Sequence, residues 1–399
     1  MMRTLLVALL IVADMALAQA APLSPAASLG RDLFTDPILS ASGRQSCASC
    51  HDPANHYAPS NDLAVQPGGR HMERHGIRAV PSLTYLDEAP AFSTALGNPD
   101  GSESGPGGGF DWDGRFDSIG AQSLMPLTTA YEMANPDIMS ILRRLADNTG
   151  YATRFRALFG KTVLMDEKQG AKALSRVFGA YQHEDSSFHP YTSKYDFYVR
   201  GLATLTPAEA RGMILFNDAE RANCAACHTA GVGPGRDGAL SSGQFTDFFF
   251  RAVGAPHNPA IDKDLPEGND LGLCGPLRRD LSPARDPANR RFCGQFMTPT
   301  LRNVATRHVF FHNGVFRSLR DVIDFYVTRD ITPQRWYRKR IYDDLPIGAA
   351  ALIDHDDMPF AAQHPGARPV LSQQEEDDII AFMGTLTDGY TIPTGRKPH

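Results

Sequence analysis

Two short runs of cysteine and histidine carry the clearest chemistry in this sequence. Each run has two cysteines three residues apart and a histidine directly after the second: Cys47, Cys50 and His51, then Cys224, Cys227 and His228. This C-x-x-C-H pattern is typical of covalent c-type haem attachment, in which the thiols form thioethers and the histidine binds the iron. On one helical turn the cysteines share a face and the histidine lies beside them, so one porphyrin is held at its edge and at its metal. A thioredoxin-like dithiol, a zinc pair or a disulfide would each fit a lone C-x-x-C better than this duplicated pattern.

The same short helix is expected before each motif. Residues 29–34 and 211–216 both place a glycine four residues before a phenylalanine, and a loop then leads to the cysteines. Glycine permits a close helix crossing and the aromatic ring packs near the haem, as a cytochrome c domain requires. Thr206 to Glu209 reads as a capping box with proline in the first turn, so a helix begins there.

This duplication predicts a mainly α-helical protein with two cytochrome c-like domains, residues 21–200 and 201–399. Each domain would bind one covalent c-type haem and contain long irregular loops. The C-terminal tail is expected to be able to pack back on the first domain. Apolar residues at helical spacing predict further helices at 138–145, 171–181, 319–326 and 373–386. Glycine, serine and proline make residues 97–109 a predicted loop.

The first twenty residues resemble a secretory signal. Arg3 precedes an apolar run, and small residues spaced for cleavage follow at Ala16 to Ala20. A membrane anchor is the weaker alternative because the run falls short of the ~20 residues that a span needs, and no later segment is long and apolar enough. In an exported chain, the two cysteines outside the haem motifs, Cys274 and Cys293, predict a disulfide, with two free buried thiols as the alternative.

Composition narrows the classes of partner. Of the 399 residues, 42% are hydrophobic and 21% charged, as in a soluble globular protein. The net charge is −6 and no basic block stands out, which argues against nucleic acid and leaves open a basic protein partner.

Several further motifs, in order, resemble the bacterial dihaem cytochrome c peroxidase/MauG family. Besides the two haem motifs, these are Trp112-Asp113-Gly114-Arg115, Gln122, Glu132-Met133, residues 299–303 and His312-Asn313-Gly314, and the resemblance runs from Leu29 to Asp388. It implies a periplasmic enzyme with a peroxidatic N-terminal haem and an electron-transfer C-terminal haem. Such an enzyme reduces hydrogen peroxide with electrons from a cytochrome c, a cupredoxin or a protein substrate, and a homodimer is compatible with it. A dihaem electron carrier without chemistry of its own is the alternative.

The resemblance also assigns roles to three side chains of the first half. Peroxide cleavage needs a group that moves a proton onto the departing oxygen, and Glu132 is the candidate, with Gln122 as its hydrogen-bonding neighbour. Trp112 corresponds to an aromatic residue between the haems that relays electrons. On residue type alone, Glu132 near a helix end, a surface Gln122 and a core Trp112 are the ordinary interpretations.

The second iron ligand of the C-terminal haem distinguishes branches of the family. In its peroxidases a methionine stands fourteen residues after the histidine that is His312 here, and that position is Tyr326, as in MauG-like members. A phenolate stabilises ferric and higher oxidation states, whereas a thioether favours ferrous iron. The alternative is a core tyrosine, with Met297 or another methionine as ligand.

Two departures from the family pattern concern further ligands. Ala79 stands where the family often has a calcium-binding asparagine, and Arg307 and Val309 replace a threonine and a proline that bind calcium through backbone carbonyls, so the resemblance leaves calcium in doubt. His71 and His75 lie in the stretch where some peroxidases place a loop histidine on the resting peroxidatic haem, but surface histidines are the commoner explanation.

Overall fold

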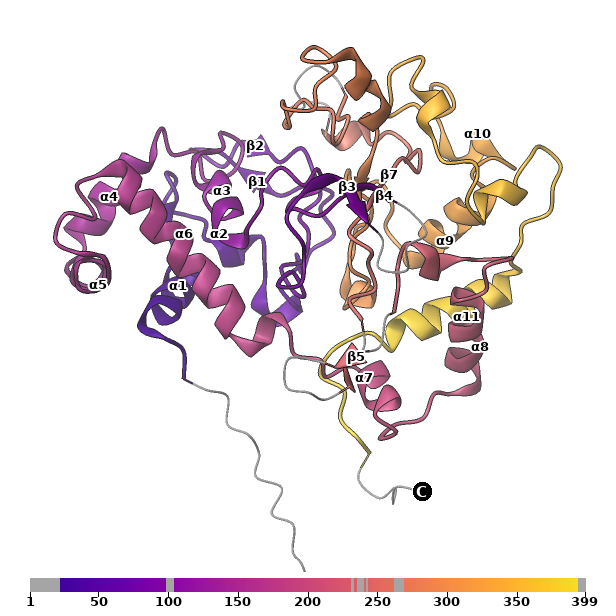
Figure 1. Cartoon of the computed structure of the whole chain (residues 1–399), viewed down its shortest axis with the longest axis horizontal. Coiled ribbons are helices and arrows are strands. Elements are labelled where there is room, and N and C mark those ends of the chain that lie inside the picture. The colour runs from indigo at the N-terminus through magenta and orange to yellow at the C-terminus, as the bar shows by residue number, and fades with distance from the viewer. Residues whose placement is uncertain are drawn as a thin grey trace, which may run out of the picture.

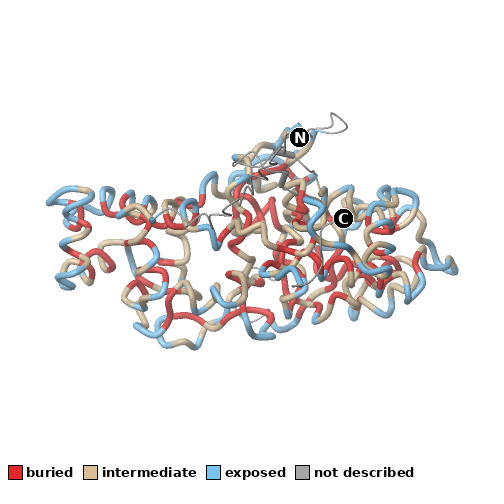
Figure 2. Tube along the Cα trace, turned by 90° about the horizontal axis from the view of Figure 1, so that it is seen from below, coloured by how far each residue is buried: buried red, intermediate tan, exposed pale blue. Residues whose placement is uncertain are grey.

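The computed structural model describes residues 22–97, 104–230, 233–234, 240–241, 243–261 and 269–393. The expected secretory signal, residues 1–20, lies outside the described residues. The chain forms two lobes side by side, with the N-terminal half in one and most of the C-terminal half in the other (Figure 1). Buried segments run through both lobes, and exposed loops line their outer ends (Figure 2).

Helices dominate the described part of the chain. Those of the first half are α1 (Pro25–Thr35), α2 (Ile119–Gln122), α3 (Met125–Thr128), α4 (Ile138–Asp147), α5 (Thr149–Phe159), α6 (Glu167–Glu184) and α7 (Lys194–Val199). Those of the second half are α8 (Pro207–Phe216), α9 (Leu319–Thr328), α10 (Pro333–Trp336) and α11 (Gln373–Gly384). The expected mainly α-helical class and the helices at 138–145, 171–181, 319–326 and 373–386 are therefore confirmed, with α4, α6 and α9 extending beyond the predicted ends and α11 ending two residues earlier.

The N-terminal lobe is built on the crossing of α1 and α6. A side chain at Gly30 would collide with the backbone carbonyl of Val177, so only glycine lets the two helices approach this closely. The apolar face of α1, including Leu29 and Leu33, then packs into a core with α4, α5 and α6. Phe34 lies in a neighbouring aromatic cluster that also contacts Cys47 of the first haem motif.

The C-terminal lobe repeats this arrangement with α8 and α11. A side chain at Gly212 would collide with the carbonyl of Asp378, and the ring of Phe216 packs edge-on against Phe382 at 5.2 Å. Thr206 caps α8 and forms the expected capping box with Glu209. The glycine of each repeat therefore has the predicted role in a close helix crossing, whereas the packing of each phenylalanine near a haem stays a prediction.

The strands are short antiparallel pairs. They are β1 (Pro67–Gly68) with β2 (Arg74–His75), β3 (Ser93–Gly97) with β4 (Ser104–Gly107), β5 (Gly233–Pro234) with β6 (Leu240–Ser241), and β7 (Phe250–Arg251) with β8 (Phe296–Met297). The prediction of a continuous loop over residues 97–109 is wrong at its ends, because Leu96 and Gly97 pair with Gly105 and Ser104. Glycine-rich composition weakens a strand but does not prevent backbone pairing.

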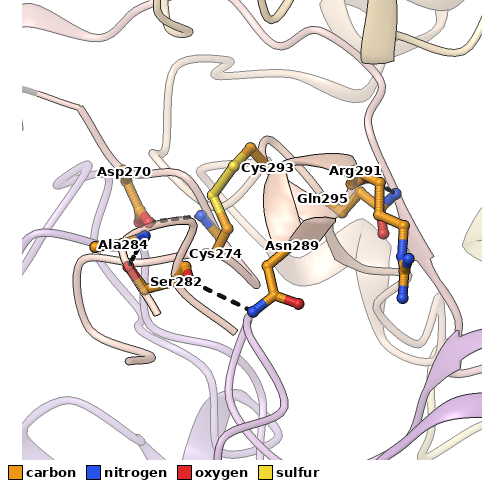
Figure 3. Close-up of a disulfide and its surroundings, with 9 residues drawn as sticks. Asp270, Cys274, Ser282, Ala284, Asn289, Arg291, Cys293 and Gln295 are labelled. Atoms are coloured by element: carbon orange, nitrogen blue, oxygen red, sulfur yellow. Dashed lines mark hydrogen bonds between the residues drawn. A yellow bond between two sulfur atoms is a disulfide. The ribbon is translucent and has the colours of Figure 1, made fainter. Parts of the chain in front are cut away.

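The disulfide between Cys274 and Cys293 is present (Figure 3). It lies in a small core with Phe250, Leu273 and Phe292. The same loop carries Asp270, whose carboxylate accepts a hydrogen bond from the Gly272 amide. The disulfide therefore restrains a long irregular segment close to a charged residue that reaches the other lobe.

Helix α7 packs with the C-terminal lobe. Tyr195 belongs to the large core of that lobe, and Asp196 forms a fully buried ion pair of 2.8 Å with Arg302. The tail returns towards the first half, because the Tyr85 hydroxyl donates to the carboxylate of Asp388. The domain bounds 21–200 and 201–399 stay a prediction. Within the described ranges, none of the helices has the length and apolar character needed to cross a membrane.

Candidate active site

The first C-x-x-C-H motif forms a tight 3-10 turn, Cys47–Ser49. The Ser46 amide donates to the Ser49 hydroxyl at 2.9 Å, and the His51 amide donates to the Cys47 carbonyl at 2.9 Å. The His51 ring lies with Nδ1 at 3.2 Å from the Tyr57 carbonyl, which can only accept, so Nε2 is left with a free lone pair. Burial lowers the pKa of His51 to about 4, and the ring is therefore neutral at physiological pH. A neutral, oriented imidazole is the form that binds a metal.

The second motif has the same geometry in the 3-10 turn Cys224–Ala226. The His228 amide donates to the Cys224 carbonyl at 2.9 Å, and Nδ1 lies 3.0 Å from the Phe245 carbonyl. Burial again lowers the pKa of this histidine to about 4. The two motifs lie 177 residues apart in sequence, and in both the histidine carries its proton on Nδ1.

The four motif cysteines form no disulfide. Burial raises the pKa of each to about 12 and keeps it protonated. A structural zinc site takes four such ligands, and within the described ranges no group of three or more histidine, cysteine, aspartate or glutamate side chains could hold a metal ion. Free cysteine pairs, each beside a neutral histidine with an available nitrogen, fit a c-type haem in both lobes.

One cavity connects the second motif with the first half of the chain. It is lined by Cys224, Cys227 and His228, and by Trp112, Gln122 and Asp111 from the N-terminal half. Tyr326 of α9 lines it too, as do Met297 and Met358. The expected ligand His228 and the expected ligand Tyr326 therefore face one common space.

Tyr326 lies between two aromatic rings. Phe311 and Phe360 stack almost parallel to it at 5.9 and 5.5 Å, and its backbone carbonyl accepts from the Gln363 amide at 2.6 Å. Burial raises the pKa of the phenol, and the next largest causes are the two thiols of the second motif. The phenol therefore lies beside Cys224 and Cys227 on a side chain with little rotational freedom.

Glu132 lies beside the first motif. It follows α3, and its backbone is fixed by the Glu132 amide donating to Thr129 and by the Gly69 amide donating to the Glu132 carbonyl. Its charge contributes to the raised pKa of Cys50. Burial, and after it the carboxylate of Asp111, raise the pKa of Glu132 to about 8 against the opposing charge of Arg115. The side chain is therefore mostly protonated at neutral pH and can donate a proton.

Asp111 links the expected acid to Gln122. The Gln122 amide donates to the Asp111 carboxylate at 3.0 Å, and Arg115 forms an ion pair with the other oxygen at 2.6 Å. The backbone of Asp111 adopts a left-handed conformation with φ of 67°. Burial is also the largest influence on this carboxylate and raises its pKa. The sequence did not identify Asp111 as a site residue, because it lies directly before the Trp112-Asp113-Gly114-Arg115 motif and outside it.

Trp112 lies at the contact between the lobes. Its indole Nε1 donates to the Ala79 carbonyl at 2.8 Å, and its backbone carbonyl accepts from the Met297 amide at 3.0 Å. The neighbouring Asp113 is completely buried and pairs with Arg78 at 2.8 Å, while Arg78 also pairs with Asp270 at 2.5 Å. These bonds fix the indole by contacts with residues of both halves of the chain.

The His312-Asn313-Gly314 motif contacts the N-terminal lobe. His312 accepts from the Ala79 amide through its backbone carbonyl at 2.7 Å, and its ring stacks on Phe296 at 3.4 Å. Gly314, at φ of 63°, lies against the backbone of Ala64, where a side chain would collide. The carbonyl of Ala79, the residue at the expected calcium-binding asparagine position, is engaged by Trp112.

His71 and His75 are both exposed on the surface around β2. The backbone amide of His71 donates to Glu73, and His75 is paired in β2 with Pro67.

Comparisons with known proteins agree with this geometry. The model of the family described as "Di-haem cytochrome c peroxidase" matches residues 24–204. The methylamine utilization protein MauG of Paracoccus denitrificans is 38% identical over 93% of this chain and 90% of its own, and that of Methylorubrum extorquens is 32% identical over 92% and 80%. The crystal structure of the diheme peroxidase BthA from Burkholderia thailandensis superposes with a TM-score of 0.81, at 34% identity over 95% of this chain and 90% of that one.

The fold and the two matched haem-attachment motifs define a dihaem c-type oxidoreductase. The chain belongs to the di-haem cytochrome c peroxidase family that includes MauG, and it is a dihaem peroxidase. The expected resemblance is confirmed, and the alternative of an electron carrier without chemistry receives no support from these relatives.

Proposed function

We propose that this protein is a MauG-like periplasmic peroxidase whose C-terminal haem is bound by His228 and Tyr326. The observation that carries the proposal is that both side chains, with Cys224 and Cys227, line one cavity. In this scheme residues 1–20 export the chain, and Cys47, Cys50 and His51 hold the N-terminal, peroxidatic haem. The reductant is a small cytochrome c, a cupredoxin or a protein substrate.

When bound, the haems supply iron that accepts peroxide and carries oxidising equivalents. The chain supplies the proton. Glu132 is protonated at neutral pH, so its carboxyl group can donate to the departing oxygen of hydrogen peroxide and can be reprotonated afterwards. In this proposal Gln122 is the hydrogen-bonding neighbour of Glu132, and the bond of its amide to Asp111 supports that role by fixing its side chain.

Electron exchange between the lobes would use Trp112. Its indole lines the cavity of the second motif and is fixed by the Ala79 carbonyl, two residues before Pro81, whose backbone influences the pKa of His51. The indole bond to the Ala79 carbonyl and the backbone bond to the Met297 amide hold the ring in place. The ring therefore needs to move little when it gains or loses an electron. Trp112 therefore connects the surroundings of the two motif histidines.

A Tyr326→Phe variant tests the ligand assignment. It keeps the stacking on Phe311 and Phe360 and removes only the phenol oxygen, so the ferric spectrum and the reduction potential of one haem should change while two haems stay attached. The matched control is Met297→Leu, which removes one of the alternative sulfur ligands from the same cavity and should leave both properties unchanged. An unchanged spectrum in Tyr326→Phe, or a ligand-type change in Met297→Leu, would contradict the proposal.

A further inference from the structure

Arg307 joins the C-terminal lobe to the N-terminal lobe at the edge of the cavity that contains the second haem-attachment motif. It follows the 3-10 turn Val304–Thr306 of the C-terminal lobe, and its Nη2 donates to the Val80 carbonyl of the N-terminal lobe at 2.9 Å. It also lines the cavity that contains His228. The guanidinium therefore lies at the boundary of the two lobes, beside the cavity of the second motif.

This guanidinium lacks an anionic partner within the described part of the chain. Its side-chain hydrogen bond there goes to a neutral carbonyl, and no described carboxylate forms an ion pair with it. Burial lowers its pKa to about 10, which leaves it charged at neutral pH. The other arginines near the interface differ, because Arg78 and Arg115 each pair with two aspartates.

Arg307 is half-buried and has no carboxylate partner among the described residues, which favours an anion in the cavity that it lines. The anionic groups of a haem are its two carboxylate side chains. A guanidinium is suited to them because its planar fork binds a carboxylate through two parallel hydrogen bonds.

We infer that Arg307 binds haem carboxylate at the junction of the lobes and raises the reduction potential there. This inference rests on the two-haem content of the proposed function and not on peroxide chemistry. A fixed positive charge stabilises the form of the haem that has gained an electron, so a neutral residue at this position should make reduction harder. Arg307 is therefore a positioning and potential-setting residue.

The test is a redox titration of the purified protein without peroxide. Arg307→Gln removes the charge and keeps an amide donor for the Val80 carbonyl, whereas Arg307→Lys keeps the charge. Arg279→Gln removes an exposed positive charge and is the matched control. Haem content after denaturation is measured for every variant, so that loss of cofactor is not mistaken for a change in potential.

We expect Arg307→Gln to lower the equilibrium constant for reduction of at least one haem tenfold or more, which is about 59 mV for one electron. Arg307→Lys and Arg279→Gln should stay within about threefold of the parent, or about 28 mV on the same scale. If Arg307→Gln loses a haem that Arg307→Lys retains, the charge is needed for binding, which also supports the inference. Unchanged potentials in Arg307→Gln, or equal effects of Gln and Lys, would overturn it. A protein that shows the shift but consumes no peroxide would keep this inference and lose the proposed function.

Discussion

Replacing Glu132 with glutamine tests the proposed proton donor. The substitution keeps the size of the side chain and removes its titrating proton. General acid catalysis typically contributes 10²–10⁴-fold, so peroxide turnover should fall by about 100-fold or more with both haems retained. The matched control is Glu167→Gln on the exposed start of α6, which should have no effect.

The pH dependence of peroxide turnover gives a second test of Glu132. With a pKa of about 8, Glu132 is about 90% protonated at pH 7 and about 10% protonated at pH 9, so turnover limited by this proton should fall roughly tenfold between them. The contribution of Glu132 to the free energy of unfolding also decreases as pH rises. The folded protein keeps a proton that the unfolded chain releases above its ordinary pKa of 4.5, so this contribution is present below pH 4.5 and is lost as pH rises to about 8.

The assay is steady-state consumption of hydrogen peroxide, with a reduced small cytochrome c as donor, across about pH 6 to 9. Parallel denaturant unfolding measures the free energy of unfolding of parent and variant at each pH. The Glu132→Gln variant should lose both the alkaline fall in turnover and part of the pH dependence of stability. Near-normal turnover in this variant, or a flat alkaline limb in the parent, would refute the role assigned to Glu132.

Three further predictions concern the framework that holds the site. Gly212→Ala should lower the free energy of unfolding, measured by urea titration, by about 1–3 kcal/mol or more, because a side chain there collides with α11. The control Gly384→Ala has no atom nearby and should be neutral or stabilising by up to about 1 kcal/mol in the same titration. Joint replacement of Cys274 and Cys293 by serine should cost about 3 kcal/mol by the loop-entropy estimate, and an unchanged urea midpoint would refute it. Asp196→Asn should cost about 3–5 kcal/mol because it leaves a buried guanidinium without its carboxylate, and a shift in melting temperature below that of an exposed Asp→Asn variant would contradict this.

Local patterns in the sequence predicted a large part of this framework. The C-x-x-C-H spacing, the glycine four residues before each phenylalanine and the capping box at Thr206 all depend on residues close in the chain. Each of them has the expected geometry. The helix crossings could be predicted because a glycine on the apolar face of a helix usually indicates close contact with another helix.

Interactions between distant residues were the part that the sequence did not predict. The pair of Asp196 with Arg302 spans 106 residues, and the bond of Arg307 to Val80 spans 227. The influence of Asp111 on Glu132 depends on how two irregular loops fold together, for which periodicity gives no signal. The β3–β4 pair was missed because its residues have low strand propensity.

The central claim is that two covalent haems in this chain catalyse reduction of peroxide. The most direct measurement takes purified protein, determines haem per chain after denaturation, and then follows hydrogen peroxide consumption with a reduced cytochrome c. The proposed function predicts two haems that survive denaturation and continuous turnover that depends on the donor. One haem or none, or two haems without peroxide turnover, would contradict it.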